Sequence, residues 1–362
     1  MKNNTRSQVI KWGVALSATV ALVAGCSSPQ SQTPGQPTTD QTTTPTSAIS
    51  LTGAGSTFIY PILSKWIDIY HTKTGVEINY QSVGSGAGIN QIKSQTIDFG
   101  ATDAPLNDAD LKTMPKKVLQ IPAVAGAEAV SYNLPSVKQP LKLDGMVLAD
   151  MFLGNIKKWN DPKIVALNAG VTLPELPVTI SHRSDGSGTT YIFTSYLSAV
   201  SPQWNSKVGA GKSVSWPVGI GGKGNSGVAG VIKQTPGAIG YVELAYAKQN
   251  KLSFALLKNK SGKFVAPTVD ATTAAIAGSI NALKKDIRSP IINATGDAAY
   301  PIAGMTYVLA YEDTGNAEKG SAIQAFLKWA ISDGQKMSKE LYYAPLPPAV
   351  VAINENNVEK IH

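Results

Sequence analysis

Four segments of this chain share one pattern, in which a short apolar strand leads into a small-residue turn and a helical pattern follows. The turns lie at residues 53–58, 84–88, 100–103 and 183–190. Short strands that alternate with helices are typical of an α/β fold. In an open α/β sheet such turns gather at the carboxyl ends of the strands, where ligands bind. The pattern therefore predicts both the fold class and the place of a site.

Apolar periodicity predicts the individual elements. Helix 57–71 has Ile62, Trp66 and other apolar residues on one face, and Pro61 lies in its first turn, where proline is tolerated. Strands are expected at 49–52, 76–80, 97–101, 178–181, 238–242 and 305–309, and helices at 57–71, 89–94, 143–152, 160–167, 228–233 and 321–331. No internal repeat is visible.

The chain begins like an exported lipoprotein precursor. Basic residues precede an apolar stretch from Trp12 to Ala24 that is too short to span a membrane, which predicts a signal peptide over residues 1–25. Cys26, the only cysteine, follows small residues at the expected cleavage point. This arrangement predicts acylation of its thiol and a lipid anchor in the periplasm or at the cell surface. The alternative is a free cysteine beside an ordinary cleavage site.

Composition separates a tether from a folded part. Residues 26–48 are rich in Ser, Thr, Gln and Pro and are expected to form a disordered tether. The globular sequence that follows has roughly 315 residues, a length that suggests two domains. The formal net charge is +8, and three of the basic residues lie before Cys26, which leaves +5. The bases are interspersed with acids, so a nucleic-acid partner is not expected.

Residues 183–190 are the most informative stretch. They place Arg183, Asp185, several hydroxyls and two glycines directly before an apolar run with helical spacing. Such a turn aims free backbone N–H groups at a ligand, and the planar guanidinium of Arg183 fits a tetrahedral oxyanion. The stretch predicts a phosphate or sulfate site, with Asp185 orienting Arg183. The alternative is a polar turn with an Arg–Asp pair on the surface.

The other three turns each offer a hydroxyl or a carboxylate beside backbone N–H groups. Thr57 and Ser85, taken singly, fit the role of helix N-caps, but convergence on one anion explains all the turns together. Asp103 repels an anion unless that anion carries a proton to donate. Phosphate near neutral pH carries one and sulfate does not, so a buried Asp103 is expected to discriminate between them.

Five segments resemble the periplasmic phosphate-binding protein of the phosphate-specific (Pst) ABC importer. They are residues 51–58, 98–105, 185–189, 216–225 and 236–243, and the resemblance covers essentially the whole folded part. It implies a two-lobed periplasmic-binding-protein fold (type II-like), in which each lobe is a mixed sheet flanked by helices and the chain crosses between lobes twice. The implied lobes are 49–129 plus 301–362 and 130–300.

The resemblance also implies the ligand residues and the function. The phosphate-binding set carries over to Ser56, Thr57, Phe58, Ser85, Asp103, Arg183, Ser187, Gly188 and Thr189. Asp185 belongs to the set as the partner whose carboxylate partly offsets the positive charge of Arg183. Ser56 departs from the small apolar residue of the family. The implied protein is a monomer without catalytic residues, metal or cofactor, which binds phosphate and delivers it to the permease subunits of an ABC importer.

Enzyme motifs are poorly supported. Residues 209–213 resemble the end of a P-loop, but Ser206 occupies the position of its first glycine and no helical pattern follows. The sequence has three histidines and one cysteine, which is a poor supply for a Ser–His–Asp triad or a metal site. Two alternatives remain: a secreted phosphatase-like enzyme on the same scaffold, and a receptor for another tetrahedral oxyanion such as sulfate.

Overall fold

The computed structural model describes residues 49–362, and all structural statements below concern that part. The predicted signal peptide, Cys26 and the tether lie outside the described residues. The main sheet is mixed and nine-stranded, in the order β2-β1-β3-β12-β4-β8-β6-β7, with β9 paired to β4. The strands are β1 (Ser50–Gly55), β2 (Glu77–Ser82), β3 (Phe99–Thr102), β4 (Val118–Tyr132), β6 (Thr179–Arg183), β7 (Ile220–Gly222), β8 (Ala238–Glu243), β9 (Ser253–Phe254) and β12 (Ala303–Tyr311).

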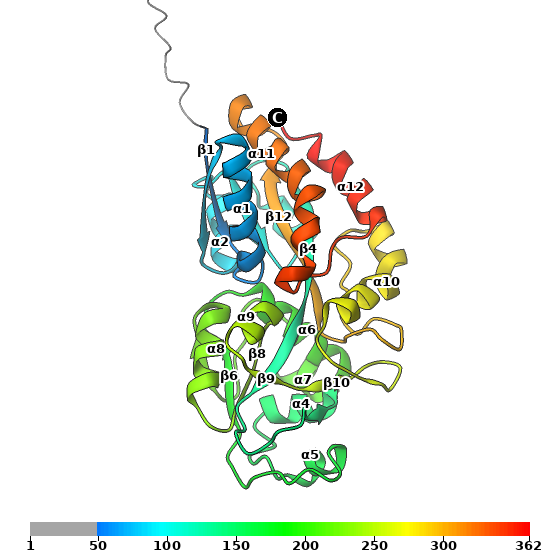
Figure 1. Ribbon diagram of the computed structural model, residues 1–362. Coiled ribbons are helices and arrows are strands. Elements are labelled where there is room, and N and C mark those ends of the chain that lie inside the picture. The colour runs from blue at the N-terminus through cyan, green and yellow to red at the C-terminus, as the bar shows by residue number, and fades with distance from the viewer. Residues whose placement is uncertain (1–48) are drawn as a thin grey trace, which may run out of the picture. The chain divides into compact units, whose positions relative to one another are not determined.

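Strand β4 divides this sheet into two half-sheets. Its residues 118–127 pair with β12, and its residues 128–132 pair with β8, in both cases antiparallel. The first half-sheet is therefore β2, β1, β3, β12 and the start of β4, and the second is the end of β4 with β8, β6, β7 and β9 (Figure 1). Strand β4 was not predicted. All of its residues are buried, so it lacks the alternation of polar and apolar residues that identifies a half-exposed strand.

Helices pack against both half-sheets. On the first, α2 contacts β1 and β3, and α11 contacts β1; on the second, α8 contacts β6 and β8, and α9 contacts β4 and β8. The helices are α1 (Tyr60–Thr74), α2 (Ser85–Lys93), α3 (Asp108–Lys112), α4 (Gly145–Phe152), α5 (Pro162–Leu167), α6 (Gly188–Val200), α7 (Pro202–Lys207), α8 (Gly224–Gln234), α9 (Leu244–Gln249), α10 (Val269–Lys285), α11 (Ala317–Ala330) and α12 (Pro348–Val358). A small sheet joins β11 (Phe264–Val265), β10 (Leu256–Lys258) and β5 (Lys142–Leu143). Within residues 49–362 every helix is too short or too polar to cross a bilayer.

The α/β class is confirmed, but three of the predicted turns have different bounds, and residues 100–102 of the turn expected at 100–103 belong to β3. Strand β1 continues through residues 53–55, because these residues pair with both β2 and β3. Helix α1 consequently begins at Tyr60 and not at Thr57. The expected turn at 84–88 is largely the first turn of α2. A Cβ on Gly88 would lie 2.5 Å from the Cα atom of Gly55, so these glycines allow close packing of helix on strand.

Candidate functional site

The turn after β1 holds the first group of predicted ligands. The Ser56 N–H donates to the carbonyl of Ala101 at 2.8 Å, which ties the turn to β3. The Ser56 hydroxyl accepts from the Phe58 N–H at 3.0 Å and donates to Asp103 Oδ1 at 2.5 Å. The Phe58 N–H is thus engaged within the turn, although it was predicted to face the anion. Thr57 is buried but is not the N-cap of α1, a position that Ile59 occupies.

Asp103 follows β3 and lies at the centre of the predicted ligand residues. Besides Ser56, its carboxylate accepts from Thr306 Oγ1 at 2.7 Å and from Ser85 Oγ at 3.3 Å. The side chain is buried, with 3 % of its residue surface exposed. Burial raises the pKa of Asp103 to about 6, although the hydroxyls of Ser56 and Thr306 and the charge of Arg183 oppose the shift. Near neutral pH this carboxylate can therefore accept a proton from a ligand.

Ser85 links Asp103 to the start of α2. Its hydroxyl accepts from the Asp103 N–H at 3.2 Å while donating to the Asp103 carboxylate. Ser85 is the first residue of α2, and the N-cap is Gly84, so the N-cap role is wrong for Ser85 as it is for Thr57. The next residue, Gly86, connects the two groups of predicted ligands, because its N–H donates to the carbonyl of Gly186 at 2.8 Å.

Arg183 ends β6 with a guanidinium that is held from two sides. Its Nε and Nη2 donate to the two carboxylate oxygens of Asp185 at 2.8 and 2.6 Å, and its Nη1 donates to Thr189 Oγ1 at 3.0 Å. The side chains of Arg183 and Asp185 are 1 % and 14 % exposed, so a surface Arg–Asp pair is excluded. Burial by itself would raise the pKa of Asp185, but the hydrogen bonds and charge of Arg183 lower it below its ordinary value. The predicted orienting role of Asp185 agrees with this geometry.

The residues after Asp185 form the start of α6. Ser187 is its N-cap and accepts from the Thr190 N–H at 3.0 Å. Gly188 packs so tightly on the other half that a Cβ there would lie 2.5 Å from the Asp103 carboxylate and 2.6 Å from the Ser85 hydroxyl. The two groups of predicted ligands, far apart in sequence, are therefore in direct contact.

Two residues were not predicted as part of this site. Asn225, in α8, donates from Nδ2 to Thr57 Oγ1 at 2.8 Å and to Thr189 Oγ1 at 3.2 Å, so it joins predicted ligands of both groups. It lies in segment 216–225, one of the five segments that carried the family resemblance. That resemblance was the signal in the sequence from which Asn225 could have been predicted. Thr306 lies inside β12 beside a β-bulge, and no local signal marks it.

Two hollows flank this cluster. One, of about 370 Å³, is lined by Thr57, Asp185 and Lys223 among others. The other, of about 650 Å³, is lined by Gly86, Gly186 and the lysines Lys93 and Lys212 among others. Both hollows border the contact between the two half-sheets and have a lysine in their walls, whose positive charge attracts anions.

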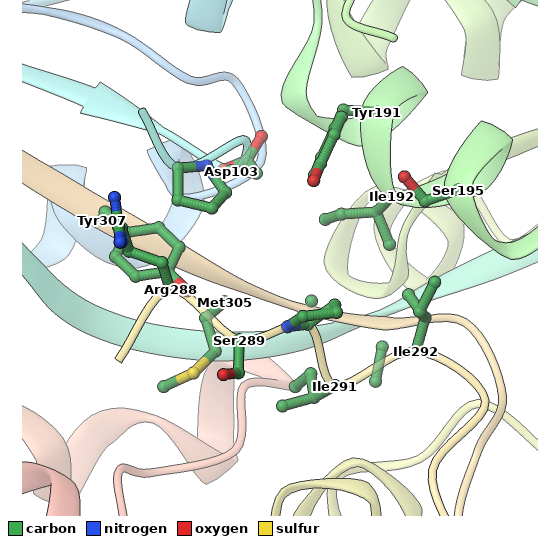
Figure 2. A pocket seen from close by; sticks show the side chains of 14 residues that line it. Asp103, Tyr191, Ile192, Ser195, Arg288, Ser289, Ile291, Ile292, Met305 and Tyr307 are labelled. Atoms are coloured by element: carbon green, nitrogen blue, oxygen red, sulfur yellow. The ribbon is translucent and has the colours of Figure 1, made fainter. Parts of the chain in front are cut away.

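A small cavity of about 30 Å³ lies between α6 and β12, with Asp103 in its wall (Figure 2). Tyr191 and Ile192 of α6 and Met305 of β12 line it, together with Arg288 near one end. Of the predicted ligands only Asp103 takes part in its lining. The cavity is thus separate from the cluster of hydroxyls around Thr57 and Thr189. Within residues 49–362 no three His, Cys, Asp or Glu side chains gather in a metal-binding group.

Comparison with known proteins places the chain in a family. A family model described as "PBP superfamily domain" matches residues 31–334. The chain is 45 % identical to the phosphate-binding protein PstS of Xylella fastidiosa (strain 9a5c) over 340 residues, which cover 92 % of this chain and 93 % of that protein. It is 46 % identical to the PstS of Haemophilus influenzae over 306 residues, with 84 % and 91 % covered.

Solved structures agree at the level of the fold. A periplasmic phosphate-binding protein (PfluDING), solved with bound phosphate, superposes with a TM-score of 0.66 at 19 % identity and covers 86 % of this chain and 99 % of that chain. An ABC-type phosphate transport receptor from Vibrio cholerae gives 0.54 at 18 % identity, with 82 % and 100 % covered. The predicted α/β periplasmic-binding-protein fold is confirmed. From the family model and the identity to the curated relatives, the chain belongs to the PBP superfamily and, within it, to the PstS family of phosphate-binding proteins.

Proposed function

We propose that this protein binds inorganic phosphate between its two half-sheets and presents it to a phosphate ABC importer as the substrate-binding subunit. The function is binding and not catalysis, as in the PstS relatives. One observation carries the assignment of the site: Asp103, a buried proton acceptor, contacts hydroxyls of the first half and packs against Gly188 of the second. Membership in the PstS family supports the identity of the anion.

The proposed ligands are neutral hydrogen-bond donors and one charged group, the Arg183 guanidinium. The Thr189 hydroxyl accepts from the Arg183 guanidinium, Asn225 joins this hydroxyl to that of Thr57, and the N-terminus of α6 adds backbone N–H groups. Ser56, Phe58, Ser85, Ser187 and Gly188 complete the predicted set. Since Asp185 already engages Arg183 through two hydrogen bonds, the site offers less than one full positive charge. Selection for phosphate then depends on the proton that Asp103 accepts.

We propose that the half-sheets belong to two lobes, residues 49–129 plus 301–362 and residues 130–300, which close on the ligand. Contacts that join the halves include Gly86 N–H to Gly186 and Asn225 to Thr57. Opening breaks these contacts, and an anion held from both sides favours closure. Small-angle scattering with and without saturating phosphate tests the hinge, and identical profiles would count against it.

Competition calorimetry with phosphate, arsenate and sulfate tests the ligand. The wild type is expected to bind phosphate and arsenate and to reject sulfate. Asp103→Asn keeps the shape of the side chain but cannot take the ligand's proton. It should weaken phosphate binding by roughly tenfold to 100-fold, the worth of a charge-assisted hydrogen bond, and relax the rejection of sulfate. An equal loss for both anions would refute the proton-accepting role, and no heat with phosphate in the wild type would refute the function.

The phosphatase alternative and the export signals have their own tests. Release of product from a chromogenic phosphoester by the purified protein would favour an enzyme.

The residues before Cys26 support an exported, lipid-anchored protein in the periplasm or at the cell surface. Cys26→Ser should move the protein from the membrane fraction to the soluble fraction. The same distribution for both forms would contradict the anchor.

A further inference from the structure

Two glutamates face each other at the point where β4 leaves β12 and joins β8. Glu128 of β4 pairs directly with Glu243 of β8 in the antiparallel register, which brings their side chains to one place on one face. Neither residue has any exposed surface. Both carboxyl oxygens of Glu128 and one of Glu243 lack a hydrogen-bond partner among the described residues. The remaining oxygen of Glu243 accepts from the Ala245 N–H at 2.8 Å.

The surroundings of the pair offer little positive charge. The titratable groups that interact with it electrostatically are Asp103 after β3, Arg183 at the end of β6, Tyr241 of β8, Tyr246 of α9, Tyr300 before β12 and Tyr343 near the C-terminus. Arg183 is the one cation among them, and it already donates two hydrogen bonds to Asp185. Two ionised glutamates would thus be buried without a counter-ion, which is costly enough that such groups bind protons instead.

Burial raises the pKa values of both glutamates well above their ordinary values. The charge of Asp103 raises them further, whereas the backbone N–H of Ala245 favours the charged form of Glu243. The two carboxyls therefore titrate as a coupled pair. Glu128 has no such donor among the described residues.

The pair is connected to the proposed ligand residues. The Glu243 N–H donates to Asn225 Oδ1 at 2.9 Å, and the amide of Asn225 donates to Thr57 and Thr189. A Cβ on Gly126 would lie 2.6 Å from the Phe58 ring and 3.5 Å from Glu243 Oε1, so this carboxyl lies beneath the turn that carries Thr57 and Phe58. An anion bound beside Asp103 adds negative charge near the pair, which favours its protonated form. In an open cleft, water that reaches the pair would stabilise the ionised carboxylates.

We propose that Glu128 and Glu243 form a buried proton-binding site, which takes up a proton from solvent when the cleft closes on phosphate. The inference rests on the proposed function, because phosphate supplies the charge that drives the uptake. Glutamine has the shape of a protonated glutamate but cannot release a proton. Glu128→Gln and Glu243→Gln therefore remove the uptake without creating a cavity.

Calorimetry in two buffers of different ionisation enthalpy counts the protons taken up as phosphate binds at pH 7. Relative to the wild type, Glu128→Gln should lower this count by about half to one proton, and the pH dependence of the affinity should weaken by up to about tenfold per pH unit. The protons that phosphate itself carries in solution are the same for both proteins, so their contribution cancels. Glu175→Gln, at an exposed ion pair with Lys158, is the matched control and should behave as the wild type.

Several outcomes separate this inference from the proposed function. If wild type and both glutamine variants bind phosphate with the same proton count, the proton site is overturned while phosphate binding stands. If the wild type gives no heat, the proposed function itself fails. Should the variants not fold, infrared difference spectra of the wild type decide. Phosphate should increase the carbonyl band of protonated carboxyl groups, also in Asp103→Asn, in which Asp103 cannot contribute to it, and an unchanged band would overturn the inference.

Discussion

Substitution of Gly188 by alanine tests whether the two groups of predicted ligands must touch. A Cβ at this position would lie 2.5 Å from both Cβ and Oδ2 of Asp103 and 2.6 Å from Ser85 Oγ. Because carbon atoms pack at about 3.5 to 4.0 Å, the start of α6 has to withdraw from Asp103 by about 1 Å. Overpacking of this kind costs about 1 to 3 kcal/mol, which corresponds to roughly fivefold to 150-fold weaker phosphate binding.

The control for this variant is Gly230→Ala in α8. Nothing lies within 4 Å of a Cβ placed there, and the position is helical. Alanine should therefore leave phosphate binding unchanged and stabilise the helix by about 0.5 to 1 kcal/mol. Calorimetric titration measures the affinities, and scattering of the phosphate-free proteins reports whether Gly188→Ala is more open. A folded Gly188→Ala protein that binds phosphate as tightly as the wild type would refute the closed geometry.

Three further predictions concern the surroundings of Asp103. Asn225→Ala removes an amide that donates to Thr57 and Thr189, and it should weaken phosphate binding by about tenfold or more in a titration, since buried partners are left unpaired. Ser56→Ala removes a hydrogen bond that lowers the pKa of Asp103, so the pH profile of the phosphate affinity should shift to higher pH. Because the pKa of Asp103 is raised from 3.8 to about 6, the folded protein keeps a proton that the unfolded chain loses. Ligand-free stability should fall by about 3 kcal/mol as pH rises from about 4 to about 6, and urea unfolding of Asp103→Asn should lack this component.

Local chemistry explains why much of segment 183–190 was predictable. Arg183 and Asp185 lie two residues apart, and Ser187 caps the helix that begins at the next residue. Such contacts form within a few residues, so side-chain chemistry and spacing are enough to predict them. The strands and helices that were predicted follow from periodicity, which is a local property, whereas β4, α10 and α12 were not predicted. The bounds of β1 and α2 were not, since pairing with two neighbouring strands decided where β1 ends.

From the sequence came the α/β class, the polar turns and the family to which the chain belongs. Tertiary structure decided which side chains meet around Asp103. Thr306 lies 203 positions from Asp103, and Asn225 lies 168 positions from Thr57, and long-range strand and helix packing brings each pair together. Burial, which raises the pKa values of Asp103 and Glu128, is likewise a property of the folded chain. No local pattern encodes how far a carboxyl lies from water, because that distance depends on every element packed around it.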